Sequence, residues 1–544
     1  MYEFITCTFL SDSLFNLGPE SQIITVLILL FSVTLFQLLD ARSEYFSPIF
    51  IQGRGTEDYH VHHDEKLIVP DARFFFLKRK GNIDISDFVT YPISGAYGIA
   101  GPTLAYLGFK IFGMNNLGLR FFFILITTAT NLFCVLSLLN VSPGLIGIIF
   151  SIAYILNYNS FVINRLAIVE HILTLFLTGI LLLYLSNTDF FLHNIHWLGF
   201  VAAISILAKP NFVINVYIPI FVIAFIEKLG FPGIRKLFLY SIGGVIFFEG
   251  IQMLILYKLG IARGRYYTVL RGIKQISGTG KWIALTGHLQ SVGRKVFLKY
   301  IFNFAEWYGS KPLIKTPKKG IQIAKGLLFL ILLICGLMFG VHHTIPRSGW
   351  VIITFIGIYL ISLSPFYYYL KRAFSIFPLT IILLAIISHI LFREFLTVFP
   401  DGSGVIVILL SLIAVIYIAF QLLTIVNLPA LRSHGVEKNS ASLDNDLPKG
   451  SVVYTHCLGY RFFWQAKKQR LMSGDDTIMS NQMIVNWAIE NRAKYVILSY
   501  RENWNTGGPI EPETTGLLRP IKFYKTIPTE SDVQETFILC ELII

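Results

Sequence analysis

Residues 62 to 76, HHDEKLIVPDARFFF, bring ionisable side chains of several kinds together. They follow soon after an apolar run long enough to cross a membrane. The adjacent carboxylates Asp64 and Glu65 are the first candidates for chemistry, because a carboxylate within reach of a hydroxyl can act as a general base. Three interpretations stay open at this point: a catalytic carboxylate, a metal site and a solvated loop.

Histidines at and just before the start of this segment support the metal interpretation. His60, His62 and His63 are metal-ligand types at close spacing, and Asp64 follows them directly. Adjacent histidines point in different directions in any regular structure, however, so His62 and His63 are poorly arranged to hold one ion. We therefore favour the carboxylates and keep the three histidines as the alternative.

Ionisable residues beside other apolar runs form a second group of candidates, because charges there are expensive and often functional. Arg165 precedes Glu170 in NRLAIVEH, and Lys209 lies in LAKPNF. Lys371 and Arg372 lie in FYYYLKRAF. Such cations suit a phosphate group. The alternatives are a structural ion pair for Arg165 with Glu170, and cations that snorkel to the interface for the rest.

Two further charges lie within apolar runs. Arg120 opens a span, and we expect it to act as an interfacial anchor. Glu249 is flanked by apolar residues in GGVIFFEGIQM, where packing against a neighbouring span is the favoured interpretation.

The composition shows which elements must position these residues. Of 544 residues, 54% are hydrophobic and only 14% are charged, and the mean hydropathy is +0.64. These values indicate a mainly α-helical, polytopic membrane protein and exclude disordered and fibrous classes. The formal net charge of +13 then points to anionic lipid head groups or a phosphate-bearing lipid substrate as partners, not to nucleic acid.

Apolar runs long enough, or nearly so, to cross a hydrocarbon core recur along the chain and predict about eleven spans. They lie near residues 22–39, 118–139, 144–160, 171–187, 195–208, 211–226, 237–257, 325–341, 350–365, 374–392 and 404–427. Residues 98–113 are short for a span, and we expect a juxtamembrane helix at the interface there.

Polar segments divide the chain. Residues 1–430 are predicted to form a transmembrane domain with two long loops, at 41–117 and 258–324. Residues 431–544 are predicted to form a small α/β domain, because SVVYTH and AKYVILSY have strand-like patterns and flank a helical one. With the N-terminus inside and an odd number of spans, both loops and this domain share the outer face of the membrane.

Several motifs in this frame resemble one family. DEKLIVPDARFFFLKRKG, GPTLAYLGFKIFG and NNLGLRFFF follow the first span in this order. They resemble the first outer loop of GT-C glycosyltransferases, which include the protein O-mannosyltransferases and aminoarabinose transferases. NRLAIVEH, LAKPNF and YYYLKRAFSIFP are similar to later segments of that family, again in order. The resemblance covers most of the membrane part.

The resemblance implies a membrane enzyme that moves a sugar from a polyprenyl-phosphate donor to an acceptor hydroxyl of a glycan, lipid or protein, with inversion. Asp64 is the expected base, with Glu65 beside it, and Glu170 is expected to orient the acceptor or hold Arg165. Since the leaving phosphate is already charged, it needs fixed cations and no metal or other cofactor. These cations are expected to come from Arg165, Lys209, Lys371 and Arg372.

The resemblance also implies a bacterial inner membrane as the location, with the site on the outer face. The competing class is a polytopic transporter or flippase for a lipid or an anionic solute. We see no internal repeat of the kind that transporters show, and a first outer loop rich in carboxylates favours the enzyme.

Overall fold

The structure is a computed structural model. It describes residues 19–41, 60–79, 98–142, 144–209, 212–259, 346–363, 377–398, 435–455, 463–473, 481–499, 516–525 and 536–543, and the isolated positions 412, 415, 416, 419 and 422.

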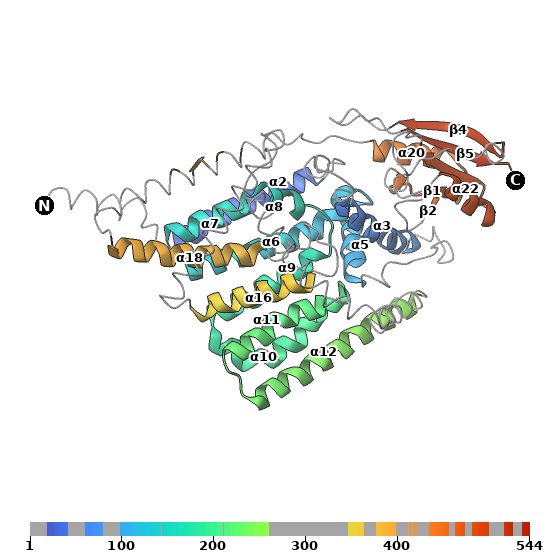
Figure 1. Ribbon diagram of the computed structural model, residues 1–544. Helices are drawn as coiled ribbons and strands as arrows, with labels where there is room; N and C mark the ends of the chain where they lie inside the picture. The colour runs from blue at the N-terminus through green and yellow to red at the C-terminus, as the bar shows by residue number, and fades with distance from the viewer. Residues whose placement is uncertain are drawn as a thin grey trace.

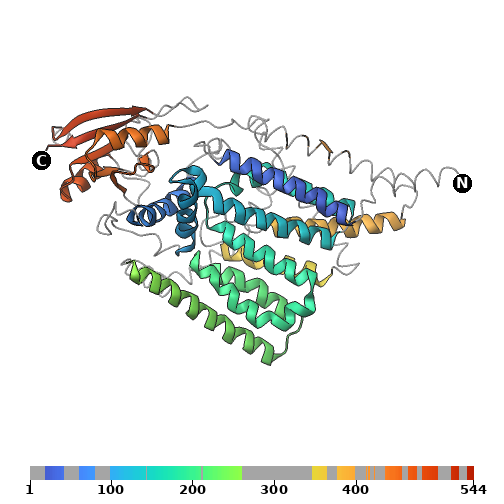
Figure 2. The same cartoon turned by 180° about the vertical axis from the view of Figure 1, so that it is seen from behind.

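Long helices packed side by side form most of the described structure (Figures 1 and 2). They are α2 (Pro19–Asp40), α6 (Asn116–Val141), α7 (Leu145–Ile155), α9 (Glu170–Ser186), α10 (Thr188–Ala202), α11 (Phe212–Ile226), α12 (Phe231–Lys258), α16 (Arg347–Leu363) and α18 (Phe377–Val398). The 3-10 helix η4 (Ala203–Leu207) continues α10. Within the described residues, five helical stretches are long and apolar enough to cross a membrane, and four shorter helices are also apolar.

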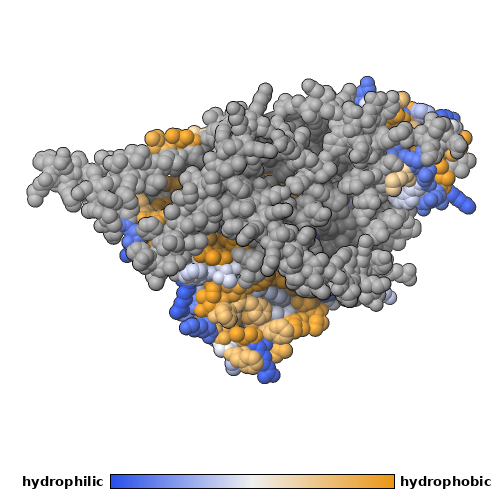
Figure 3. Space-filling model, viewed as in Figure 1, coloured by the Kyte–Doolittle hydropathy of each residue, from blue (hydrophilic) through white to orange (hydrophobic). Residues whose placement is uncertain are grey.

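The outer surface of these helices is itself apolar. α12 exposes Phe231, Phe238, Ile246 and Phe247, each by more than half of its surface. A hydrophobic surface covers the part of the molecule in which α10, α11 and α12 lie (Figure 3). Soluble proteins rarely expose apolar patches of this extent, so this surface fits contact with lipid. The prediction of an integral membrane protein is confirmed at this coarse level.

Described helices coincide with most of the predicted spans. The spans expected at 325–341 and 404–427 lie outside the described residues, apart from the isolated positions in the second. The total of eleven therefore stays a prediction. Residues 98–113 form α5 (Ala100–Phe112), whose 13 residues cover only about 20 Å. This helix is too short for a hydrocarbon core of about 30 Å, as expected for an interfacial helix.

Contacts between helix termini define two ends of the bundle. At one end, which we call the site end, α2 finishes and α6 begins beside α3 (His60–Arg79) and α5. At the opposite end, the Tyr184 hydroxyl donates to a Glu227 carboxylate oxygen at 2.5 Å, and Arg347 donates to the other oxygen at 3.1 Å. These contacts tie the end of α9 to the α11–α12 turn and the start of α16.

The α5–α6 contact depends on glycine. A Cβ atom at Gly108 would lie 1.9 Å from the carbonyl oxygen of Gly118, and one at Gly118 would lie 2.4 Å from that of Gly113. Both obstacles are backbone atoms, which cannot rotate away. The two helices approach this closely because neither has a side chain at the contact.

A five-stranded sheet forms the C-terminal part, with strand order β2-β1-β3-β5-β4. Its elements are α20 (Val436–Asp446), β1 (Val452–Thr455), β2 (Arg470–Ser473), α22 (Asn481–Glu490), β3 (Tyr495–Ser499), β4 (Leu518–Lys525) and β5 (Thr536–Leu542). β1 is parallel to β2 and β3, whereas β5 is antiparallel to β3 and β4. The predicted small α/β architecture is thus observed; its boundary near residue 431 stays a prediction. Residues 435–543 are called the C-terminal domain below.

Candidate functional site at the end of the helix bundle

Glu65 lies in α3 and forms a bidentate ion pair with Arg120 of α6. Arg120 Nε donates to Glu65 Oε1 at 2.8 Å, and Arg120 Nη2 donates to Oε2 at 3.0 Å. The backbone N–H of Ala167 donates to Oε1 as well, at 2.9 Å. Both side chains are buried, and Arg120 has no exposed surface. The expectation that Arg120 is an interfacial anchor is therefore wrong, because its guanidinium is held inside the protein by Glu65.

These contacts fix the charge state of Glu65. Burial raises the pKa of this carboxyl, but the Arg120 guanidinium and the Ala167 N–H outweigh burial and hold the pKa below its usual value. A carboxylate with a lowered pKa and three donors is a weak base. Its arrangement suits the positioning of α3 and of the turn at Ala167.

Arg165 follows the short helix α8 (Tyr158–Asn164), whose N-cap Asn157 accepts the backbone N–H of Ser160 at 3.0 Å. The Arg165 guanidinium forms an ion pair with the carboxylate of Asp40, the last residue of α2. His171 Nε2 lies 3.2 Å from the Ile163 carbonyl oxygen and 3.1 Å from that of Leu166, and so braces the turn around Arg165.

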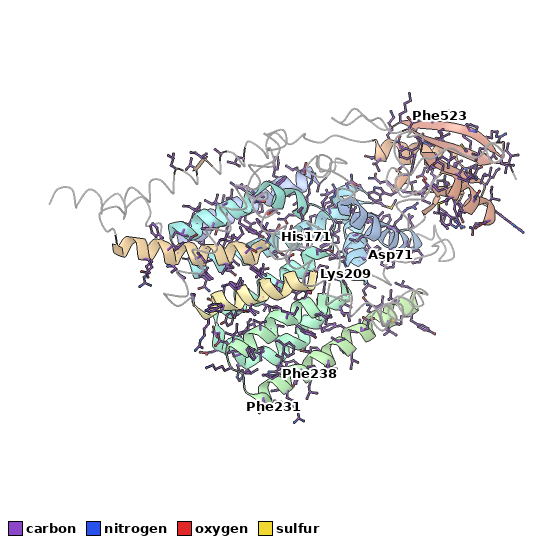
Figure 4. The ribbon with its side chains drawn as sticks, in the orientation of Figure 1. Asp71, His171, Lys209, Phe231, Phe238 and Phe523 are labelled. Carbon is purple, nitrogen blue, oxygen red and sulfur yellow. The ribbon has the colours of Figure 1, made fainter. Side chains whose placement is uncertain are left out.

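Lys209 approaches the same region from η4. Its ammonium lies 3.4 Å from Glu170 Oε1, at the start of α9, and 5.6 Å from the centre of the Phe212 ring. The Lys209 side chain is 12% exposed, whereas that of Glu170 is 3% exposed. Figure 4 shows Lys209 and His171 in neighbouring parts of the bundle, with Asp71 at the same end. At 3.4 Å, the contact between the Lys209 ammonium and the Glu170 carboxylate is longer than the Arg120–Glu65 and Arg165–Asp40 contacts.

Three cations and three carboxylates thus meet at the site end. Arg120 pairs with Glu65, Arg165 with Asp40 and Lys209 with Glu170. The six residues come from α2, α3, α6 and α9 and from the segments that follow α8 and η4. Charges in a poorly hydrated site act strongly on an incoming anion. A phosphate group has to compete with these carboxylates, and it can do so most readily at Lys209, where the contact is long and solvent reaches the side chain.

The side chains of the other predicted site residues lie outside the part of the chain that the structure describes. Asp64 lies in α3, but its side chain is outside the described residues, as are those of His60, His62 and His63. Lys371 and Arg372 also lie outside them. Among the residues that the structure describes, no group of three or more His, Cys, Asp or Glu is arranged to hold a metal ion.

Further charges at this end were missed by the sequence reasoning. Asp40, which ends the first span, has a side chain that is 11% exposed, and Asp71 and Arg73, in α3, are both 2% exposed. All three belong to a repeated Asp-Ala-Arg, at 40–42 and 71–73. Asp40 could have been found by asking which charges stand at the end of every apolar run, because the same rule selected Glu170 and Lys209.

Comparisons were made with protein families, curated proteins and solved structures, and the matches are solved structures. No protein-family model matches the chain, and no curated protein does. The crystal structure of ArnT from Cupriavidus metallidurans in the apo state is similar over 95% of this chain and 97% of its own, at 10% identity and a TM-score of 0.44. The structure of ArnT from the same organism bound to undecaprenyl phosphate is similar over 94% and 97%, at 10% identity and a TM-score of 0.39.

A superposition this loose transfers no residue role. The function proposed below is therefore argued from the contacts of the chain itself.

Proposed function

We propose that this protein is an integral membrane glycosyltransferase of GT-C type. It transfers a sugar from a polyprenyl-phosphate donor to an acceptor hydroxyl on the outer face of the membrane. The observation that carries the proposal is the set of three ion pairs at one end of the apolar bundle, one of them buried and two mostly buried. A lipid phosphate at that end would meet cations from several helices.

The chemistry follows from the charges. The acceptor hydroxyl attacks the anomeric carbon and loses its proton to a carboxylate, for which we assign Asp64. The bond from that carbon to the phosphate oxygen breaks, and the electron pair leaves with the polyprenyl phosphate. The attack and the departure occur on opposite faces of the sugar, so the configuration inverts. The leaving phosphate is already charged, and fixed cations stabilise it without a proton donor.

We assign each cation a role according to how closely its carboxylate partner contacts it. Lys209, with its 3.4 Å contact to Glu170, is assigned to the donor phosphate. Arg165 supports it from the turn after α8, while Asp40 keeps its guanidinium oriented. Glu65 and Arg120 hold α3 against α6, so Glu65 is assigned a positioning role beside the base. Lys371 and Arg372 stay candidates for the same phosphate on sequence grounds alone.

The placement on the outer face is supported by charge. Lys228, Arg235, Lys236 and Arg347 lie around the α11–α12 turn and the start of α16, at the opposite end of the bundle. Short loops rich in Lys and Arg face the cytoplasm, so the site end faces outward. In a bacterium this location is the inner membrane.

Binding of undecaprenyl phosphate to the purified protein in lipid nanodiscs tests the assignment of Lys209. We expect Lys209→Gln to weaken binding about 10- to 100-fold, because it removes a charge-assisted contact to the phosphate. The matched control is Lys110→Gln, an exposed lysine near the end of α5, which is expected to bind like the wild type. Equal affinity in all three proteins would remove Lys209 from the donor site. Movement of the lipid from one leaflet of reconstituted vesicles to the other, without glycosyl transfer, would favour a flippase.

A further inference from the structure

Arg73 lies in α3, yet its hydrogen bonds reach the C-terminal domain. Arg73 Nη2 donates to the carbonyl oxygen of Ala466 at 2.5 Å and to that of Gln469 at 2.7 Å. The Arg73 residue is only 2% exposed. A buried guanidinium is costly unless its donors are satisfied. Two carbonyl groups almost 400 residues away in sequence accept from Nη2 and offset part of this cost, whereas Nε has no hydrogen-bond partner among the described residues.

The segment that carries these carbonyls, residues 463–469, is fixed from within the C-terminal domain. The Asp444 carboxylate in α20 accepts the backbone N–H groups of Lys467 and Lys468, at 2.7 and 2.8 Å. Gln469 Nε2 donates to the Leu447 carbonyl oxygen at 3.1 Å. The acceptors of Arg73 are thus part of a rigid surface, not of a loop that follows the arginine.

Aromatic packing surrounds the same contact. The Trp464 ring stacks on Phe109 of α5, with ring centres 5.9 Å apart and planes inclined by 26°. Phe109 in turn meets Phe76 of α3 edge to face, at 6.0 Å. All three rings are buried and so help to exclude water from this docking surface. Figures 1 and 2 both show the C-terminal domain at the end of the bundle where α3 and α5 lie.

α3 connects this docking surface to the ion pairs of the site. Glu65 and Arg73 are eight residues apart on one helix, a rise of about 12 Å. Pro70 stands between them and, having no N–H, removes one hydrogen bond of the helix. A helix weakened in its middle needs support at both ends. Glu65 supplies it through Arg120, and Arg73 supplies it through the C-terminal domain.

We infer that Arg73 is a positioning residue that fastens the C-terminal domain onto α3 and so fixes the Asp64–Glu65 end of that helix. Undocking of the domain leaves the guanidinium without its two acceptors, so departure of the domain and displacement of α3 occur together. If the proposed function holds, the domain is also the wall along which an acceptor reaches Asp64, because the lipid donor occupies the membrane side. The coupling itself does not depend on that function.

Hydrogen exchange of the full chain in lipid nanodiscs tests the inference. In Arg73→Ala we expect backbone amides in residues 463–473 and 60–72 to exchange at least about tenfold faster, through local opening. The amides of β3 and β5 are expected to stay unchanged. Arg73→Lys still donates hydrogen bonds and should restore part of the protection. Arg519→Ala removes an arginine from the same domain, on the exposed edge strand β4, and should leave both segments at the wild-type rate.

Several outcomes would overturn the inference. Unchanged exchange in both segments would do so, as would faster exchange spread over β3 and β5, or Arg73→Lys behaving like Arg73→Ala. Undecaprenyl phosphate binding, measured on the same samples, keeps the two proposals apart. Arg73→Ala should weaken binding less than Lys209→Gln does, because neither Lys209 nor Arg165 lies in α3. A loss as large as that of Lys209→Gln would contradict a positioning role. Failure of the wild type to bind contradicts the proposed function and leaves the exchange result standing.

Discussion

The contacts of Glu65 show how a structural carboxylate can be distinguished from a catalytic one. Its sequence position makes it a candidate base together with Asp64. Its two oxygens accept from Arg120 and Ala167, and its pKa lies below the usual value although burial opposes this. It is an ionised structural group. The sequence motif marks a pair of acids, and the contacts distinguish their roles.

Glu65→Gln tests this role. The amide keeps the shape but leaves the buried Arg120 charge without its counterion, which costs about 3–5 kcal/mol. We expect a clear fall in the thermal midpoint of the purified protein. Glu541→Gln is the matched control, because its partners Arg519 and Lys494 are largely exposed, and the midpoint should change little.

A double variant tests the cause. Glu65→Leu combined with Arg120→Met removes both charges together, so it should be more stable than either single change. A double variant whose loss equals the sum of the two single losses would show that the ion pair contributes no coupling.

Asp446 in the C-terminal domain gives a pH-dependent prediction. Its carboxylate accepts from Lys522 Nζ at 2.8 Å and from the Tyr524 hydroxyl at 2.7 Å. Burial raises its pKa, but Lys522, Tyr524 and Ser442 together hold the pKa below its ordinary value of 3.8. A lowered carboxyl pKa contributes stability above pH 3.8, and this stability is lost as the pH falls through the folded-state value.

Asp446→Asn should therefore lower the stability of the C-terminal domain at pH 7 by about 1 kcal/mol, the scale of a partly exposed charge pair. Thermal unfolding of the full chain, followed by near-ultraviolet circular dichroism at pH 7, 4.5 and 3, measures it. The difference from the wild type should shrink below pH 3.8. A difference that stays constant down to pH 3 would show that the charge of Asp446 does not matter.

At the scale of elements, the placement of α5 against α6 depends on absent side chains. Gly108 and Gly118 let two backbones meet where a Cβ atom would lie within 2.4 Å of a carbonyl oxygen. The aromatic face of α5 that meets Trp464 is positioned by this contact. Hydropathy found both segments, but it carries no information about close backbone contacts.

Gly108→Ala should push α5 away from α6 and destabilise the protein by about 1–3 kcal/mol, as overpacking does. Gly243→Ala and Gly250→Ala, both in α12, are matched controls, because a Cβ atom there meets nothing within 4 Å. We expect a lower thermal midpoint for the first variant and an equal or slightly higher one for the controls. A wild-type midpoint for Gly108→Ala would show that α5 can shift without loss.

The elements themselves were predictable, because long apolar runs have a single stable form in a bilayer. The described spans and the C-terminal α/β sheet follow the pattern of the sequence. The pairings were not predictable: Arg120 meets Glu65 across 55 residues, and Arg165 meets Asp40 across 125. Such partners are chosen by tertiary packing, which periodicity does not contain. The placement of the Asp64 side chain and of Lys371 and Arg372 stays a prediction.

On the scale of the whole molecule, one end of the apolar bundle holds three ion pairs with little exposure to solvent and carries the C-terminal domain. α3 joins the two, through Glu65 on one side and Arg73 on the other. A lipid-linked donor in the membrane and an acceptor outside it would meet at this junction. We propose that Asp64, on α3, deprotonates that acceptor.

The most direct test is release of polyprenyl phosphate from a panel of polyprenyl-phosphate-linked sugars, followed by mass spectrometry with cell-envelope acceptors present. We expect release by the wild type from at least one donor. In Asp64→Asn we expect release to fall about 10²- to 10⁴-fold, the usual contribution of a general base, with undecaprenyl phosphate binding retained. Release that is undiminished in Asp64→Asn, or absent from every donor with the wild type, would rule out the proposed role of Asp64.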